Sequence, residues 1–212
     1  MTKYVKVLSF LALLAGSQQA SAIVMSTDYD FSGSFTNDND IVKLNFSVDS
    51  LSTVTIFSSS WDDGGLDPIL AIWDASGNKM HEQDDGGNIG STSSNGVLYD
   101  HGSWDSYFSV ELAAGDYTAT IGMYNNFSVS NLLADGFSQD ANPNFSGGLF
   151  GCSNDVFCGA GGDNRTADWA FHVLNVSTAD VEVSQVPEPG TLAILALGLV
   201  GLNMQARRKK LA

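Results

Sequence analysis

The chain has 212 residues, with 9 basic and 24 acidic side chains and a net charge of −15. So acidic a chain lacks the basic face that binds a phosphate backbone, which excludes nucleic acid as the main partner. Hydrophobic residues make up 43% of the chain and charged residues 16%. This balance is typical of a folded chain and excludes a largely disordered one.

The first 22 residues have the three parts of an export signal. Two lysines lie near the start, an apolar run covers residues 7–15, and Ala-Ser-Ala at residues 20–22 is a small-residue cleavage site. The apolar run is too short to anchor the chain in a bilayer. We therefore predict that signal peptidase cleaves after Ala22.

The next part of the chain contains short segments with the two-residue hydrophobic period of half-buried strands. They cover residues 42–48, 53–57, 107–112, 117–123 and 169–176. Residues 68–73 are apolar throughout, which predicts a strand covered on both faces. The turn at residues 113–116 predicts that its two flanking strands form a hairpin. We expect one all-β domain over residues 23–183, folded as a single antiparallel β-sandwich.

Several motifs in this region carry a family resemblance. Residues 65–78 read as an Asp-Pro strand that ends in Asp-x-x-Gly, Asp-Asp-Gly follows at residues 84–86, and residues 112–117 read Leu-x-x-Gly-x-Tyr. In this order, over residues 31–125, they are similar to the bacterial pre-peptidase C-terminal domain. The resemblance implies a jelly-roll-like sandwich without catalytic activity. Residues 132–165 depart from that pattern as a long insertion rich in Gly and Asn.

Acidic side chains gather at the predicted turns and strand ends. Residues 23–186 hold 3 cations and 23 acids, and this excess of negative charge attracts cations. Ca²⁺ prefers six to eight oxygen ligands, which loops of Asp, Asn and Gly supply. Calcium is therefore the candidate cofactor, with the candidate ligands Asp38, Asp40, Asp67, Asp74, Asp84 and Asp85. The alternative is that these residues only form turns and keep an exported chain dispersed.

Trp61 and Trp104 each stand beside Asp in a predicted loop. A ring next to a carboxylate is an arrangement that can bind a sugar, and the alternative is that both rings pack in the core or against other loop residues. The sequence has no His-x-x-His, no Gly-x-Ser-x-Gly and no phosphate-binding loop, so we expect no enzyme. A hydrolase with two carboxylates distant in sequence is the alternative that motifs do not test.

Cys152 and Cys158 lie in the Gly-rich second half of the insertion, with five residues between them. In an exported chain, two cysteines at this spacing are expected to form a disulfide, which would staple the insertion. Metal binding is the weaker explanation because two cysteines alone leave a metal site incomplete.

Residues 184–212 have three parts in a fixed order. Pro187, Glu188 and Pro189 come first, an apolar stretch covers residues 191–206, and a basic tail at residues 207–210 begins with Arg207 and Arg208. A helix over the apolar stretch would be about 24 Å long, which is short for a membrane span, and the cations favour the cytoplasmic side. The arrangement resembles the PEP-CTERM sorting signal, which implies an exosortase that removes the tail near Pro-Glu-Pro. A plain tail anchor is the alternative.

Together these features predict an exported, non-catalytic β-sandwich that the C-terminal helix holds transiently in the inner membrane. We expect a structural or adhesive role in the cell envelope or in an extracellular polysaccharide matrix, with calcium as the candidate cofactor. The alternatives are a carbohydrate-binding module and a secreted hydrolase.

Overall fold

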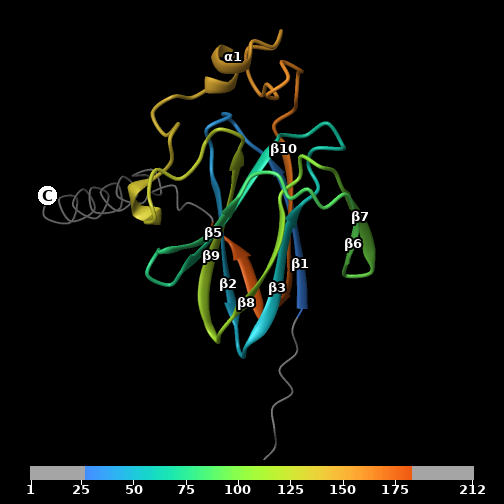
Figure 1. Ribbon diagram of the computed structural model, residues 1–212, viewed down its shortest axis with the longest axis vertical. Helices are drawn as coiled ribbons and strands as arrows, with labels where there is room; N and C mark the ends of the chain where they lie inside the picture. The colour runs from blue at the N-terminus through green and yellow to red at the C-terminus, as the bar shows by residue number, and fades with distance from the viewer. Residues whose placement is uncertain (1–26, 183–212) are drawn as a thin grey trace, which may run out of the picture.

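The computed structural model describes residues 27–182, which fold into two antiparallel sheets packed face to face (Figure 1). In spatial order, the first sheet contains β1 (Thr27–Ser34), β10 (Asp168–Val176), β3 (Ser52–Ser58) and β8 (Tyr107–Leu112). The second contains β11 (Thr178–Val181), β2 (Val42–Val48), β9 (Gly115–Met123), β4 (Pro68–Asp74) and β5 (Lys79–Gln83). The predicted all-β sandwich is confirmed. The predicted export signal and C-terminal helix lie outside the described residues.

Three smaller elements lie outside the two sheets. A hairpin of β6 (Gly90–Ser94) and β7 (Val97–His101) projects from the side of the sandwich (Figure 1). The insertion contains the short helices η1 (Leu133–Asp135) and α1 (Phe145–Phe150). Within residues 27–182, no helix is long and apolar enough to cross a membrane.

The core lies between the two sheets and follows the two-residue period of the strands. Alternate apolar side chains of each strand point inward, because successive residues of a strand face opposite sides of its sheet. Fully buried examples are Leu44 from β2, Ile56 from β3, Ile121 from β9 and Val173 from β10. Closing the sandwich removes these side chains from water, which is the main favourable term in folding.

The uniformly apolar strand β4 is buried on both faces, as predicted. Leu70 and Ile72 belong to the core between the sheets. Trp73 points to the other side and is also fully buried, because Phe137 of the insertion covers it with ring centroids 6.4 Å apart. The Trp73 indole donates a hydrogen bond to Thr120 Oγ1 at 3.1 Å. The insertion therefore supplies a second, smaller core on the outside of the five-stranded sheet.

The predicted hairpin across residues 113–116 is wrong. β8 pairs with β3 in the first sheet, whereas β9 pairs with β2 and β4 in the second sheet. The short link at residues 113–114 therefore passes from one sheet to the other. Alternation shows only that each strand has a buried face, and two strands facing each other across a core alternate as two strands of one hairpin do.

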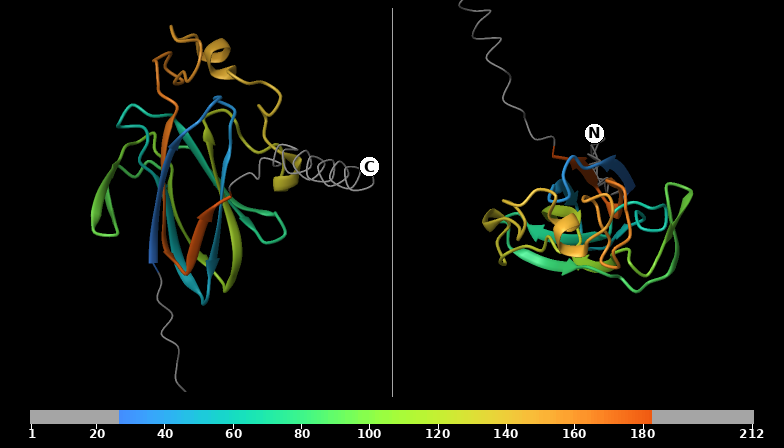
Figure 2. Two further views of the ribbon diagram at one scale, coloured as in Figure 1. Left: turned by 180° about the vertical axis from the view of Figure 1, so that it is seen from behind. Right: turned by 90° about the horizontal axis from the view of Figure 1, so that it is seen from above.

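One end of the sandwich collects most of the long loops. The loops at residues 35–41, 59–67, 84–89 and 102–106 and the insertion lie at this end, with α1 above them (Figures 1 and 2). Hydrogen bonds join neighbouring loops, such as the one from Gly86 N to Asp105 O at 2.8 Å. Because the sheets fix where each loop starts and ends, residues distant in sequence meet here.

Candidate metal centre

Three carboxylates meet where β4 begins and β5 ends. Asp67 directly precedes β4, and Asp84 and Asp85 directly follow β5. Since the two strands are antiparallel neighbours with Leu70 opposite Gln83, the start of one lies beside the end of the other. One carboxylate oxygen from each aspartate lies within 4.8 Å of the others. We call Asp67, Asp84 and Asp85 the acidic cluster.

Neighbouring residues fix the backbone of the acidic cluster. Ser106 Oγ lies within hydrogen-bond distance of the carbonyl oxygens of Asp84 and Gln83, the latter at 3.0 Å. Gly86 N donates to Asp105 O, and a Cβ at Gly86 would lie only 2.9 Å from that oxygen. The glycine in Asp-Asp-Gly is therefore required for this close approach of two loops. Sequence reasoning did not assign this role to residues 105 and 106.

The cluster contains buried carboxylate oxygens without hydrogen-bond donors. Asp67 is only 2% exposed, Asp84 is partly buried, and Asp85 is exposed. Within residues 27–182, Asp67 Oδ1 and Asp84 Oδ1 are buried and accept no hydrogen bond. A buried carboxylate without a partner is costly, since it loses water and gains nothing in exchange. A proton or a bound cation would therefore stabilise these two oxygens.

The protonation of the cluster reflects the same burial. Burial raises the pKa of Asp67 to about 8, and the negative charges of Asp84 and Asp85 act in the same direction. Burial and the charge of Asp85 raise the pKa of Asp84 to about 7. Asp85 also has a raised pKa because of partial burial. Near neutral pH the cluster therefore holds protons that a divalent cation would displace.

The donor set fits calcium. All three side chains are carboxylates, the hard oxygen ligands that Ca²⁺ prefers, and together they offer up to six oxygens. Ca–O distances of 2.3–2.6 Å place ligand oxygens up to about 5 Å apart across the ion, and one oxygen from each aspartate lies within such reach of the other two. The exposed side at Asp85 admits water as a further ligand.

The other three candidate ligands lie elsewhere and have their own hydrogen-bond partners. Asp38 is fully buried and accepts bonds from the backbone N–H groups of Phe145 and Ser146 at the start of α1. Asp40 accepts from backbone N–H groups in the loop before β2. Asp74 accepts from Ser76 N and Asn78 N in the turn after β4. The structure therefore brings together three of the six candidate ligands, and the other three accept hydrogen bonds from the backbone of a turn, a loop or the start of α1.

Trp61 and Trp104 lie against each other beside the acidic cluster. Their ring centroids are 5.6 Å apart, and we call them the aromatic pair. Arg165 covers the ring of Trp61, with its Cζ 3.6 Å from the ring centroid. Trp104 is 45% exposed. Neither ring belongs to the core between the sheets, and packing of the two loops against each other, through the two rings and Arg165, agrees with the loop-packing alternative.

Cys152 and Cys158 are joined by a disulfide, with their Cα atoms 5.5 Å apart. The bond closes a small loop that follows α1. Ser146 Oγ accepts a hydrogen bond from Cys158 N at 3.0 Å, and Ser146 is itself bonded to Asp38. The crosslinked loop is therefore tied to the loop between β1 and β2.

A buried hydrogen-bonded chain joins β1, β10 and the residue after β3, and no motif indicated it. His172 Nε2 lies 2.8 Å from Ser59 Oγ, and His172 Nδ1 lies 2.8 Å from Asp30 Oδ1. The order of groups is that of a hydrolase triad. Here, however, the imidazole is 1% exposed and lies against the rings of Phe57 and Tyr99. Burial lowers the pKa of His172. Asn95, in the turn of the β6–β7 hairpin, donates to Asp30 Oδ2 at 2.8 Å, which ties the hairpin to β1 of the four-stranded sheet.

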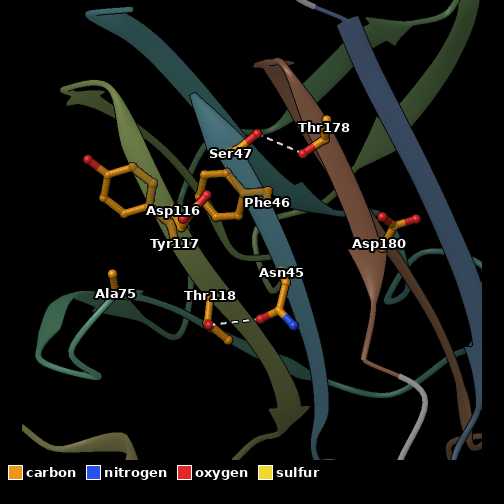
Figure 3. Close-up of a pocket in the computed structure, with 9 residues that line it drawn as sticks. All are labelled: Asn45, Phe46, Ser47, Ala75, Asp116, Tyr117, Thr118, Thr178 and Asp180. Atoms are coloured by element: carbon orange, nitrogen blue, oxygen red, sulfur yellow. Dashed lines mark hydrogen bonds between the residues drawn. The ribbon is translucent and has the colours of Figure 1, made fainter. Parts of the chain in front are cut away.

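A separate hollow of about 390 Å³ lies over β11, β2 and β9, at the opposite end from the acidic cluster (Figure 3). Its polar side chains pair across the strands. Ser47 Oγ is 2.7 Å from Thr178 Oγ1, and Thr118 Oγ1 donates to Asn45 Oδ1 at 3.0 Å. This pairing satisfies the hydroxyls within the sheet surface.

Comparison with known protein families gives a match in the C-terminal segment. The chain carries a PEP-CTERM protein-sorting motif at residues 185–209. This match agrees with the resemblance of the last residues to that signal. No curated protein matches the chain, and the resemblance of residues 31–125 to the pre-peptidase C-terminal domain has no support from a family match.

The PEP-CTERM motif implies an exported protein that an exosortase sorts to the cell surface or beyond it. The predicted export signal ending at Ala22 agrees with this route and lies outside the described residues, as do Pro187, Glu188, Pro189, Arg207 and Arg208. The sandwich of residues 27–182 lies between the predicted export signal and the sorting motif.

Proposed function

We propose that this protein is a non-catalytic, calcium-binding β-sandwich with a structural or adhesive role in the cell envelope or in an extracellular polysaccharide matrix. The observation that carries the proposal is the pair of buried, unpartnered oxygens Asp67 Oδ1 and Asp84 Oδ1 in the acidic cluster. The PEP-CTERM motif supports the destination, since it directs the chain out of the cell, where free calcium is available.

Calcium at this position has a clear structural effect. It bridges the start of β4 and the end of β5 and neutralises most of the charge of three neighbouring carboxylates. The rest of the sandwich keeps its strongly negative charge, because residues 27–182 contain 23 acids and only Lys43, Lys79 and Arg165 as lysines and arginines. Such a surface attracts further divalent cations, which can bridge it to acidic groups in a matrix.

Two experiments test the proposal. In isothermal titration calorimetry of the calcium-free protein, we expect one calcium ion per chain and much weaker binding of magnesium, which demands a smaller octahedral site. No calcium-specific binding heat would refute the site. For the matrix role, we expect a calcium chelator to release the protein from isolated cell-surface polysaccharide, with added magnesium as the control. Complete release in plain buffer would refute that role and leave the metal site standing.

A further inference from the structure

The aromatic pair presents one exposed ring, Trp104, and has no role in the core between the sheets. Trp104 is 45% exposed and is the single aromatic among the exposed large apolar side chains of residues 27–182. An exposed tryptophan keeps a large apolar area in water, and such positions often mark a binding surface. The pair stands out because both rings come from loops at the same end of the sandwich as the acidic cluster.

Hydrogen bonds to Asp105 hold the backbone of the two loops that carry the pair. Asp105 is 1% exposed, and its Oδ1 accepts a hydrogen bond from Trp61 N at 3.2 Å while its Oδ2 accepts one from Gly102 N at 3.0 Å. One carboxylate thus ties together the loops that carry the two tryptophans. Arg165 adds a guanidinium over the Trp61 ring and donates to the Trp61 carbonyl oxygen. Because the backbone of both loops is held before a ligand arrives, ordering these loops costs binding little.

The polar groups around the aromatic pair indicate which class of ligand it can bind. Asp62 and Asp63 are exposed in the same loop as Trp61, and the Asp62 carboxylate lies against Gly102 of the neighbouring loop. Carboxylates accept hydrogen bonds from hydroxyl groups but repel anions. Arg165 is no free anion site, since its Nε donates to Gly65 O at 2.8 Å and its side chain is only 11% exposed. An apolar ring beside hydrogen-bond acceptors matches a neutral sugar, which has an apolar C–H face and hydroxyl donors.

The same loops are hydrogen-bonded to backbone that lies one or two residues from the acidic cluster in sequence. Gly86, which follows Asp84 and Asp85, donates to Asp105 O at 2.8 Å. Arg165 Nε bonds to Gly65 O, two residues before Asp67. Both halves of the aromatic pair therefore rest on backbone that the three carboxylates would push apart when charged and that a cation would hold together.

We propose that Trp61 and Trp104 form a stacking surface for a neutral polysaccharide, and that calcium in the acidic cluster holds this surface in its binding geometry. The inference rests on the proposed calcium site and adds to it a ligand class and a coupling. The sugar ring stacks on Trp104, the exposed member of the pair, and its hydroxyl groups donate to the carboxylates of Asp62 and Asp63.

Affinity electrophoresis tests this directly. The mature protein is run through gels that contain dextran, laminarin or galactomannan, which are neutral, or alginate, which is anionic, with calcium or with a chelator. We expect retardation by at least one neutral polysaccharide in calcium, and loss of about tenfold in affinity for Trp104→Ala, which corresponds to about 1.4 kcal/mol. The matched control is Leu98→Ala, a residue that is 66% exposed on the β6–β7 hairpin, which projects from the side of the sandwich. This variant should run as the parent does.

The outcomes separate the two proposals. Equal retardation of the parent and Trp104→Ala, retardation by alginate alone, or no retardation by any of the gels overturns the sugar surface. A calcium-induced rise in melting temperature that persists in Trp104→Ala shows that such a loss is not a folding defect. Retardation that persists in the chelator, or in Asp67→Asn, overturns the coupling. A protein that binds calcium in calorimetry but no polysaccharide retains the calcium site and loses this inference.

Discussion

Replacing Asp67 by Asn is the sharpest single test of the metal centre. The amide keeps the size of the side chain but removes the charge of the most buried carboxylate in the acidic cluster. In calcium, the variant should lose most of the stabilisation that the ion gives the parent. In chelator at pH 8, it should be at least as stable as the parent, because the parent must then bury a carboxylate whose pKa is raised to about 8.

The size of the effect follows from mass action. A ligand present at about 100 times its dissociation constant stabilises the native state by about 2.7 kcal/mol. For a domain of this size, 1 kcal/mol changes the melting temperature by roughly 2–4 °C. The parent should therefore melt about 5–11 °C higher in calcium than in chelator, and Asp67→Asn should show only a small part of that difference.

Thermal unfolding followed by circular dichroism measures both variants in calcium, magnesium and chelator. The matched control is Asp74→Asn, the same substitution in the turn after β4, where the carboxylate accepts bonds from Ser76 N and Asn78 N. This control is expected to melt lower in every buffer and to keep the full calcium difference. The reasoning is refuted if Asp67→Asn keeps the difference of the parent, or if both variants lose it equally.

Three further predictions follow. First, calcium binding should strengthen from pH 6 to pH 8 and release protons, because the raised pKa values of Asp67 and Asp84 make protons compete with the ion. Calorimetry in buffers of different ionisation enthalpy measures the affinity and the proton release, and an affinity that does not depend on pH would contradict the prediction. Second, the free energy of unfolding should fall as the pH drops below about 6.5, because the lowered pKa of His172 means that the unfolded chain binds a proton which the folded protein does not. His172→Gln should reduce this pH dependence in urea unfolding, and an unchanged pH dependence would mean that other groups cause it. Third, Phe137→Ala should uncover Trp73, cost about 1–3 kcal/mol and shift the tryptophan emission to longer wavelength, whereas an unshifted spectrum would mean that other side chains cover the ring.

The sandwich could be predicted because its central strands carry strong local patterns. The alternation in residues 42–48 matches β2 from end to end, and the apolar run at residues 68–73 lies within β4. The pairing of the strands could not be predicted from these patterns. β8 and β9 are adjacent in sequence but belong to opposite sheets, and both patterns are the same whichever sheet a strand joins. β1 was missed because none of its residues is fully buried, and the β6–β7 hairpin because its buried residues are Ser94 and His101 in place of an apolar row.

The site shows the same division between local and distant information. Composition directed attention to aspartates but could not choose among six of them, since turn formation and metal binding use the same residue type. The choice depends on which strand ends meet. Asp67 lies before β4 and Asp84 after β5, so recognising that these strands form one hairpin would have paired them. The chain from Asp30 through His172 to Ser59 joins residues up to 142 positions apart and left no sequence signal.

The place of β10 in the first sheet has a consequence for biogenesis. β10 lies between β1 and β3, and β11 completes the second sheet against β2, so the last two strands close both sheets. Contacts between such distant segments form late, because a long loop must close before they contribute. Neither sheet can be finished until residues 168–181 are present, and the sorting motif starts only a few residues later. A chain that ends before residue 168 therefore lacks both its closing strands and its sorting motif.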